Sequence, residues 1–559
     1  MRAVRLVAAL RRLVFVVTTL VRAGMIAPMR PDKYLRLGLV VRRHGATPMA
    51  GIGLAAVRRP RGTALVDERG SMTWAELDRR VDAIAAALAD RTPRPTTIGI
   101  LCRNHRGLVE SLAATTRIGA DALLLNTGFS APQLADVLER EGAELVIYDE
   151  EFAGLVEHAR SRIPDLGEVL AWTDGSRTAD TVDGLELARR GRRPAKPERP
   201  GRIILLTSGT TGTPKGARRS GSGGAGALAA MFDRIPWRAE ETTVVAAPMF
   251  HAWGFGQLAI SATMTCTVVM RRKFDPEATL ALVEEHRASG LAVVPVMLER
   301  IVDLPDEVLD RHDLSTLRFV TASGSRMRSD AVLSFMDRFG DLVYNSYNAT
   351  EAGLISTATP ADLRVAPDTA GKPVAGTVVR ILDEDLTPVR RGEVGKIAVL
   401  SDSQFEGYTS GDSKDFHEDY MISGDVGRLD DAGRLYVAGR DDDMIVSGGE
   451  NVYPLEVEET ITAHDAVLEA VVVGVDDEQY GQRLAAYVVL RPDGEATVDD
   501  LKAHVKAQLA GYKVPRDVVF LDELPRNASG KVMPRELPPV EPAPLVEPAP
   551  LVEPVETQG

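Results

Sequence analysis

Short apolar runs alternate with longer helical patterns along most of this chain. The runs are rich in β-branched residues and end in polar turns, which is typical of buried strands. Strands are expected at residues 202–206, 243–246, 291–294 and 317–321, and helices at 74–89 and 276–287. Alternation of this kind between about residues 63 and 437 predicts an α/β fold with layered, largely parallel sheets.

A second folding unit is expected toward the C-terminus. The chain has 559 residues, whereas a single hydrophobic core stops growing near ~250–300 residues. After Gly439 the pattern becomes that of a shorter α+β unit. Its helices are expected at 455–463 and 498–509, and its strands at 468–475 and 484–490.

The last 22 residues differ in composition from the rest. The six residues 540–545, Val-Glu-Pro-Ala-Pro-Leu, recur as residues 546–551. Proline at this density prevents a helix and favours an extended, solvated conformation. Residues 538–559 are therefore expected to form a Pro-rich disordered tail, with a docking peptide for a partner as the alternative.

Charge and cysteine content exclude several classes of protein. The formal net charge is −14 and the body of the chain has no long basic run, which argues against nucleic acid as a partner. The two cysteines, Cys102 and Cys266, cannot form a disulfide framework. They are expected to be buried, reduced thiols.

The N-terminal residues are basic and partly apolar. No acidic residue precedes Asp32, and Arg2, Arg5, Arg11, Arg12 and Arg22 flank an apolar run at 13–21. That run is far shorter than the ~20 residues that span a bilayer. Three interpretations remain open: a secretory signal, a helix docked on the body of the protein, and a basic amphipathic helix on an anionic membrane surface.

The strongest local signal follows the expected strand at 202–206. Residues 207–216 read Thr-Ser-Gly-Thr-Thr-Gly-Thr-Pro-Lys-Gly. Glycines let backbone N–H groups approach an anion, hydroxyl groups add donors, and Lys215 supplies charge. This predicts a phosphate-binding loop, but not a Walker loop, because Gly216 follows the lysine where that motif needs Ser or Thr.

Residues 221–226 match the dinucleotide pattern GxGxxG. No strand is expected before them, which the dinucleotide-binding motif requires. A mobile Gly-rich surface loop is the expectation for this segment.

The loop at 207–216 resembles the phosphate loop of the adenylate-forming superfamily, which includes acyl-CoA synthetases. Further segments resemble motifs of that family in the family's order, and the resemblance covers about residues 63–535. These segments are 248–254 beside the acyl pocket, 322–327 for adenine, 344–351 for adenine and magnesium, 423–425 for ribose, 439–451 for the hinge and thiol tunnel, and 525–531 for the catalytic lysine.

The resemblance implies a role for individual residues of this chain. Lys531, Glu351, Thr350 and His251 are the implied catalytic residues, with Glu351 as the Mg²⁺ ligand; a packed core histidine is the alternative for His251. The implied residues for binding ATP and CoA are Thr207, Ser208, Gly209, Thr210, Thr211, Gly212, Lys215, Gly324, Ser325, Tyr347, Asn348, Asp425, Arg440, Gly448 and Gly449. Asp442 is the implied hinge.

Physical chemistry supports these roles separately. A carboxylate that attacks the α-phosphorus of ATP meets a polyanion, so the site must supply cations and N–H donors. Mg²⁺ prefers one or two carboxylates plus phosphate oxygens, and an ionised Asp425 accepts hydrogen bonds from ribose hydroxyls. Asn348 replaces the family's usual glycine and is expected to keep that turn at a positive φ. Two adjacent glycines, Gly448 and Gly449, leave a groove for a pantetheine arm.

The resemblance therefore implies an ATP-dependent fatty-acid–CoA ligase that uses ATP, Mg²⁺ and CoA. Its expected parts are an extension at 1–50, an AMP-binding domain at 51–438, a hinge at 439–442, and a mobile lid domain at 443–537. The apolar Met249, Trp253 and Phe255 favour a medium- to long-chain acid. The alternatives are an acyl-AMP ligase that loads a carrier protein and a non-catalytic fatty-acid uptake or scaffold protein. ATP chemistry favours a cytoplasmic location, with peripheral contact through residues 1–30 at the inner face of the membrane.

Overall fold

The computed structural model divides the chain into two compact units. The large unit comprises residues 1–437 together with Arg526–Lys531, and the small unit comprises residues 438–525 and 532–559. The lysine loop at 526–531 thus belongs to the large unit by its contacts. The structure describes residues 2–45, 47–175, 180–207, 215–219, 224–349, 351–401, 414–441, 443–447, 450–477, 481–527 and 530–540.

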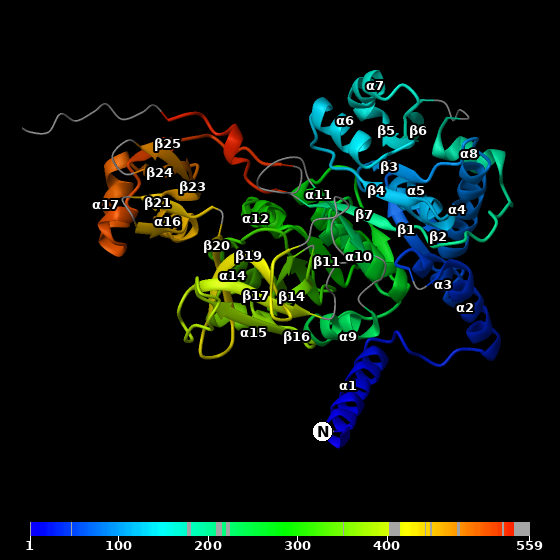
Figure 1. The fold of residues 1–559 in the computed structure, drawn as a ribbon, viewed down its shortest axis with the longest axis horizontal. Coiled ribbons are helices and arrows are strands. Elements are labelled where there is room, and N and C mark those ends of the chain that lie inside the picture. The colour runs from blue at the N-terminus through cyan, green and yellow to red at the C-terminus, as the bar shows by residue number, and fades with distance from the viewer. Residues whose placement is uncertain are drawn as a thin grey trace, which may run out of the picture. The chain divides into compact units, whose positions relative to one another are not determined.

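The first sheet of the large unit has six strands in the order β6-β5-β3-β4-β7-β8 (Figure 1). All neighbours are parallel except β7 and β8. The strands are β3 (Thr97–Leu101), β4 (Asp121–Leu124), β5 (Leu145–Asp149), β6 (Gly167–Trp172), β7 (Ile203–Thr207) and β8 (Lys215–Arg219). The helices in this part of the chain are α5 (Arg106–Arg117), α6 (Ala131–Arg140), α7 (Ala153–Arg162) and α8 (Val182–Ala188), with a 3₁₀ turn at Glu150–Phe152. Every residue of β5 is buried, as expected for a parallel strand covered on both faces.

The second sheet has nine strands in the order β15-β14-β13-β12-β11-β9-β10-β1-β2. Its six central strands are parallel, and β2, β14 and β15 are antiparallel. The strands are β1 (Thr63–Asp67), β2 (Gly70–Thr73), β9 (Thr242–Val245), β10 (Thr267–Val269), β11 (Gly290–Val293), β12 (Phe319–Ala322), β13 (Val343–Ala349), β14 (Gly353–Ala358) and β15 (Lys372–Pro373). The helices are α4 (Trp74–Ala89), α9 (Gly224–Arg234), α10 (Ala252–Met264), α11 (Pro276–Glu285), α12 (Pro295–Val302), α13 (Asp306–Leu309), α14 (Ser329–Phe339) and α15 (Pro360–Val365).

A third, mainly antiparallel sheet lies in the large unit, apart from the last three residues of its strand β20, which belong to the small unit. It is formed by β16 (Thr377–Leu382), β17 (Gly395–Ser401), β18 (Phe416–His417), β19 (Tyr420–Leu429) and β20 (Leu435–Arg440). Pairing of β17 with β19 skips from Ile422 to Val426. The three residues between them bulge out of the ladder, and Gly424 there has a φ of 84°, which glycine adopts without strain.

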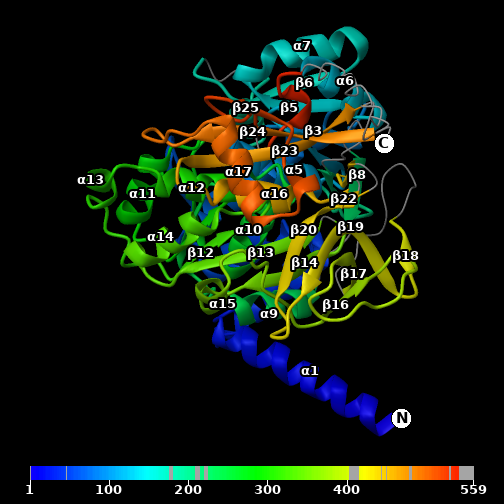
Figure 2. The same ribbon diagram turned by 90° about the vertical axis from the view of Figure 1, so that its left-hand side faces the viewer.

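Three helices precede the first strand: α1 (Arg2–Arg22), α2 (Pro31–His44) and α3 (Ala50–Arg58). α1 extends beyond the sheets with the N-terminus at its tip, as the two ribbon views agree (Figure 2). Leu20 and Ala23 pack with Phe232 and Ile260, from α9 and α10, in one buried cluster. No helix among the described residues is both long enough and apolar enough to cross a membrane.

The small unit is built around a long hairpin. Its strands are β21 (Ile445–Ser447), β22 (Glu450–Val452), β23 (Val467–Asp477), β24 (Gly481–Leu490) and β25 (Asp517–Phe520). The helices α16 (Pro454–Thr462) and α17 (Val498–Gln508) complete it, with 3₁₀ turns at Gly511–Lys513 and Pro534–Glu536. Val457, Ile461, Leu501 and Val505 from the two helices share a core with the sheet.

The expected α/β class, with a large N-terminal and a smaller C-terminal domain, is confirmed. Both cysteines are free and buried, as expected. Two local expectations are wrong. The described part of the GxGxxG segment, from Gly224 on, is the first turn of α9 rather than a surface loop. Asn348 does not have a positive φ; it lies in β13, where a register shift between Tyr347 and Asn348 takes up the irregularity. Residues 541–559 of the tail lie outside the described residues.

Candidate active site at the carboxyl ends of the parallel strands

The motif residues of the large unit gather where parallel strands end. β9, β11, β12 and β13 run in the same direction. The segments that follow them carry Met249 and His251, Val294, Ser323 and Gly324, and Glu351. In open α/β sheets this edge is where ligands bind.

A cavity of about 580 Å³ connects these segments. At one end it is lined by Ser323, Gly324, Asn348 and Lys531. From there it passes His251 and follows α10 as far as Thr263. Met25, Val41 and Met49 of the N-terminal helical region line it as well. The volume lies in the range of ~300–1,000 Å³ that encloses a drug-sized ligand.

His251 stands at the start of α10, in contact with the cavity. Its Nε2 is buried and has no hydrogen-bond partner among the described residues. Burial, with a smaller contribution from the charge of Lys531, lowers the pKa of His251 to about 4. The ring is therefore neutral near pH 7, and its free Nε2 can exchange a hydrogen bond with a bound polar group.

Asn104 holds the segment that positions His251. Its side-chain amide donates to the carbonyl of Ala247 at 2.9 Å, and its Oδ1 accepts from the N–H of Met249 at 2.8 Å. Trp253 donates from Nε1 to the carbonyl of Val293 at 2.9 Å. Sequence reasoning missed Asn104, because a lone buried asparagine lies outside every motif and only the fold brings it to this segment.

The lysine loop is a tight turn. The N–H of Gly530 donates to the carbonyl of Asn527 at 2.9 Å, and the N–H of Lys531 donates to Oδ1 of Asn527 at 3.0 Å. Gly530 has a φ of 82°, and a Cβ there would lie 2.4 Å from Cγ1 of Val296. Glycine is therefore required, and the turn places Lys531 in the lining of the cavity that also contains His251.

Tyr347 and Asp425, from motifs 78 residues apart, are brought together by the fold. The hydroxyl of Tyr347 donates a hydrogen bond to Oδ2 of Asp425. Asp425 lies in the bulge of β19, where its N–H donates to Oγ of Ser423 at 3.1 Å. An aromatic ring beside a carboxylate suits a nucleoside, since the ring can stack on a base and the carboxylate can accept from ribose hydroxyls.

Further motif residues of the large unit line the same end of the cavity or lie in the adjacent turn. Gly324, with a φ of 117°, and Asn348, whose amide donates to Oγ of Ser323 at 2.7 Å, both line the cavity. Ser325 follows Gly324 and is half-buried. Glu351 lies in the turn between β13 and β14 and is 8% exposed. A carboxylate at this depth suits a cation.

The remaining motif residues are only partly described. Thr207 ends β7 and Lys215 begins β8, and the two residues pair across a hairpin. Lys215 and Gly216 are thus in a strand, although the sequence predicted a loop there. Arg440 is half-buried at the end of β20, in the small unit. Ser208, Gly209, Thr210, Thr211, Gly212, Thr350, Asp442, Gly448 and Gly449 lie outside the described residues.

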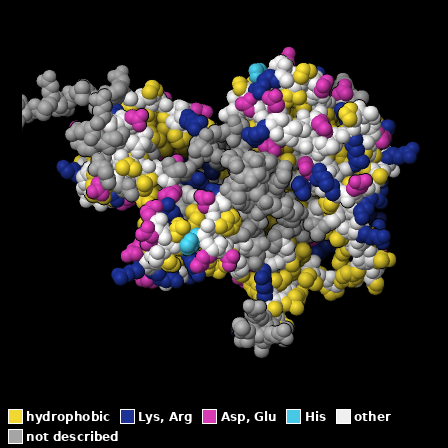
Figure 3. Space-filling view, in the orientation of Figure 1, with side chains coloured by type: hydrophobic (Ala, Val, Ile, Leu, Met, Phe, Trp, Pro, Cys, Tyr) yellow, Lys and Arg dark blue, Asp and Glu magenta, His cyan; other side chains and the backbone are white. Residues whose placement is uncertain are grey.

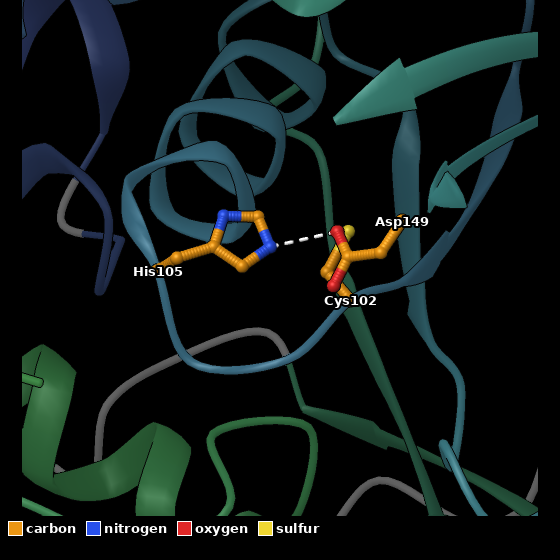
Figure 4. A group of neighbouring side chains, drawn as sticks. All are labelled: Cys102, His105 and Asp149. Carbon is orange, nitrogen blue, oxygen red and sulfur yellow. Dashed lines mark hydrogen bonds and ion pairs between the residues drawn. The ribbon is translucent and has the colours of Figure 1, made fainter. Parts of the chain in front are cut away.

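A second cluster of potential metal ligands lies in the six-stranded sheet (Figure 4). Nε2 of His105 lies 2.7 Å from Oδ1 of Asp149, and Nδ1 of His105 accepts from the N–H of Gly107 at 3.0 Å. Cys102 donates from Sγ to the carbonyl of Ile147 at 3.6 Å, and burial raises the pKa of its thiol. Nδ1 of His105 caps α5 and its Nε2 pairs with Asp149, so both ring nitrogens are used within the protein.

Comparison with known proteins agrees with this geometry. The sequence profile described as AMP-binding enzyme matches residues 54–409, and the profile of the AMP-binding enzyme C-terminal domain matches residues 456–531. The chain belongs to the AMP-binding enzyme family. This confirms the resemblance to the adenylate-forming superfamily, and residues 1–53 precede the matched region.

Individual relatives cover nearly the whole chain. A feruloyl-CoA synthase of Amycolatopsis is 32% identical over 501 residues, covering 87% of this chain and 98% of the relative. A fatty acid–[acyl-carrier-protein] ligase of Streptomyces coeruleorubidus is 29% identical and covers 86% and 94%. The structure of o-succinylbenzoate-CoA synthetase from Bacillus subtilis with its acyl-adenylate intermediate aligns with a TM-score of 0.75 at 27% identity, covering 88% and 98%.

Proposed function

We propose that this protein is an ATP-dependent, AMP-forming ligase that joins a medium- to long-chain fatty acid to CoA. The observation that carries the proposal is the continuous cavity, which joins the nucleotide-compatible end at Gly324 and Lys531 to an apolar end along α10. Relatives are named for feruloyl, succinylbenzoyl and fatty acids, so the acid itself has to be argued from the cavity of this chain.

The length of the cavity supports a linear acid. From His251 to Thr263 the cavity follows α10 for twelve residues, or about 18 Å at 1.5 Å per residue. An extended peptide advances ~3.3–3.6 Å per three backbone bonds, so one carbon–carbon bond of an extended chain advances about 1.2 Å. The groove along α10 can therefore hold a chain of about 14 carbons.

In the first half-reaction, a carboxylate oxygen of the acid attacks the α-phosphorus of ATP and pyrophosphate leaves. Lys531 supplies positive charge where negative charge gathers, and the free Nε2 of neutral His251 orients the carboxylate. Tyr347 and Asp425 hold the adenine and ribose. Glu351 would hold Mg²⁺, which would supply positive charge against the phosphate oxygens.

In the second half-reaction, the thiol of CoA attacks the acyl carbon of the adenylate and AMP leaves. Gly448 and Gly449 form the channel for the pantetheine arm in this proposal. The lid domain swings about Asp442, so that Lys531 serves the first step and the channel serves the second. Arg440 adds a contact to ribose or phosphate.

The choice of acceptor separates this proposal from a carrier-protein ligase, the activity for which the Streptomyces coeruleorubidus relative is named. The adjacent Gly448 and Gly449 favour CoA. Thioester formation with CoA and with a phosphopantetheinylated carrier protein, assayed side by side, decides between them. Release of pyrophosphate that depends on the acid separates either enzyme from a non-catalytic uptake protein.

We also propose that the enzyme works in the cytoplasm in peripheral contact with the inner face of the membrane. The exposed apolar and basic side chains of α1 and α2 support this location.

Gly256 allows a direct test of the acid. It lines the cavity five residues after His251, and a Cβ added there would meet no atom within 4 Å. Gly256→Leu should block the groove about 7.5 Å from His251. The variant should stay active with acids of about six carbons and lose activity with acids of about twelve carbons, because the longer chains extend past this point of the groove.

Gly154→Leu is the matched control, because Gly154 lies in α7 with equally open space and away from the cavity. It should leave the chain-length profile unchanged. Equal loss of short and long acids in Gly256→Leu, or a parent enzyme that prefers an aromatic acid to every linear one, would reject the proposed substrate class.

A further inference from the structure

The N-terminal helices concentrate the exposed apolar surface of the molecule. Ten of the eighteen large hydrophobic side chains that are exposed in the described structure lie between residues 10 and 41. They are Leu10, Leu13, Val14, Val17, Val21, Ile26, Tyr34, Leu35, Leu39 and Val41. Scattered single exposures are ordinary, but a concentration in one segment marks an interaction surface. We call these ten residues the N-terminal surface.

Helix α1 has two apolar faces. One face is anchored, because Leu20 and Ala23 are buried against residues of α9 and α10. The other face carries Leu10, Leu13, Val14, Val17 and Val21, which repeat at helical spacing and are 42–59% exposed. The anchored face explains why the helix is held in place, and the exposed face is left for a partner.

The charges of this segment identify the kind of partner. Residues 2–43 contain ten Lys and Arg and a single acidic residue, Asp32, although the whole chain has a net charge of −14. Arg11, Arg12, Arg36 and Arg42 are exposed beside the apolar positions. Figure 3 shows hydrophobic side chains, with Lys and Arg among them, along the lower edge of the large unit, where Figure 1 places the N-terminal helices. Apolar side chains bordered by arginines fit the headgroup region of an anionic bilayer.

The N-terminal surface is continuous with the cavity. Val41 is 42% exposed and at the same time lines the cavity. Met25, one residue before the exposed Ile26, lines the cavity too. The segment that bears the exposed apolar side chains is thus part of the cavity wall at the end away from Lys531.

We propose that the N-terminal surface docks on an anionic bilayer and that the enzyme takes its acid directly from that bilayer, past Met25 and Val41 into the cavity. The proposal rests on the proposed function, since it concerns the source of the acid. A fatty acid partitions into membranes, so an enzyme docked there meets its substrate at high local concentration. Residues 1–53 precede the region matched by the family profile, so the segment lies outside that matched region.

Binding is tested by sedimentation of the full-length protein with vesicles of phosphatidylglycerol and, separately, of phosphatidylcholine. The parent should pellet with the anionic vesicles and remain in solution with the zwitterionic ones, and added salt should weaken the association. Leu13→Asp and Leu35→Asp should each weaken binding by about tenfold, because an apolar contact is lost and a repelled charge is added.

Val365→Asp is the matched control. Val365, at the end of α15, is 69% exposed and Leu35 is 70% exposed, so the two substitutions cost the folded protein equally little. A deletion of residues 1–30 is less informative, since it also removes the buried Leu20 and Ala23 and the cavity-lining Met25.

Delivery is tested by thioester formation from a long-chain acid embedded in the anionic vesicles and from a short acid free in solution. Leu35→Asp should slow the reaction with the embedded acid by about the same factor as its decrease in affinity for the vesicles. It should leave the rate with the free acid unchanged. Val365→Asp should leave both reactions unchanged. This pattern is not expected of a substitution that merely damages the fold, which would slow both reactions.

Several results would overturn the proposal. One is a parent that fails to pellet with anionic vesicles, and another is that Val365→Asp, the control, loses as much binding as Leu35→Asp. A third such result is a Leu35→Asp variant that no longer binds the vesicles and still converts the embedded acid at the parent rate. A parent that is dimeric without lipid and becomes monomeric in Leu35→Asp would assign the surface to a second copy of the chain instead. If the parent makes no thioester from any acid, the proposed function fails, while sedimentation still reports on the lipid surface.

Discussion

At the scale of single residues, the proposed site combines one neutral and two charged groups, to which we assign separate tasks. Nε2 of His251 has no hydrogen-bond partner in the described part of the chain, Lys531 brings positive charge to the same cavity, and Glu351 is a buried carboxylate in the turn after β13. Keeping the histidine neutral avoids repulsion between it and Lys531, and burial achieves this by lowering its pKa.

The magnesium assignment is tested by Glu351→Gln, which keeps the shape of the side chain and removes its charge. Adenylate formation should fall by about two orders of magnitude, equivalent to the ~3 kcal/mol of one transition-state electrostatic contact. The rate is measured by pyrophosphate release at millimolar Mg²⁺. Glu198→Gln, an exposed glutamate, is the control. A near-normal rate in Glu351→Gln would reject the assignment.

The low pKa of His251 has a consequence for stability. The pKa of His251 in the folded state is about 4, against an ordinary value of 6.5, so the unfolded state binds more protons between these pH values and stability falls as pH drops below 6.5. Between pH 7 and pH 5 the parent should lose about 2 kcal/mol of unfolding free energy more than His251→Gln. Urea unfolding at both pH values measures the difference; parallel losses in parent and variant would show that this histidine titrates normally.

Motif residues could be identified from the sequence because each motif pairs a residue type with its chemistry over a few positions. Lys531 and His251 were found in this way, and the fold places both in one cavity. Asn104 was not found, since its role depends on hydrogen bonds to Ala247 and Met249 that join segments more than 140 residues apart. The hydrogen bond between Tyr347 and Asp425 could not be predicted from the sequence either, because these residues are 78 positions apart.

At the scale of elements, the turn that presents Lys531 depends on Gly530. A Cβ at Gly530 would lie 2.4 Å from Val296, at a φ of 82°. Gly530→Ala should therefore slow adenylate formation by at least tenfold, since a displacement of ~1 Å can cost 10²-fold in rate. Gly392→Ala is the control for backbone strain alone. Gly392 has a similar φ of 87°, but a Cβ there would meet no atom within 4 Å, so the substitution strains the backbone without displacing a neighbour. That control should lose about 1 kcal/mol of stability and keep its rate.

Secondary structure was predictable where periodicity is long and regular. α4 spans the predicted residues 74–89 without deviation, and the ends of the predicted strands differ from the observed ends by at most three residues. The prediction of a surface loop for the GxGxxG segment was wrong. Glycine signals a loop locally, whereas packing of Ala229 and Phe232 in a core with α1 and α10 makes the segment helical from Gly224. The prediction of a positive φ at Asn348 was wrong because pairing with β14 keeps this residue in a strand.

At the scale of the whole molecule, the region that matches the family profile begins at residue 54, and N-terminal helices precede it. The matched region supplies the end of the cavity lined by Gly324 and Lys531, and residues before 54 supply part of the wall at the other end. Their contribution was not predictable, because it arises from the packing of α3 against α10 and of α1 against α9, and hydropathy alone does not choose those neighbours. The basic N-terminal residues indicated a membrane contact as one of three interpretations, and that contact stays a proposal.

The central claim, that Lys531 serves adenylate formation only, is tested most directly by timing the two half-reactions separately in Lys531→Ala. The variant should fail to make adenylate from ATP and acid, yet convert supplied acyl-adenylate and CoA to thioester at close to the parent rate, because the finished mixed anhydride no longer needs that charge. Lys506→Ala, at an exposed lysine of α17, should alter neither step, and Gly449→Leu should slow only the second. Equal slowing of both steps in Lys531→Ala would contradict the account.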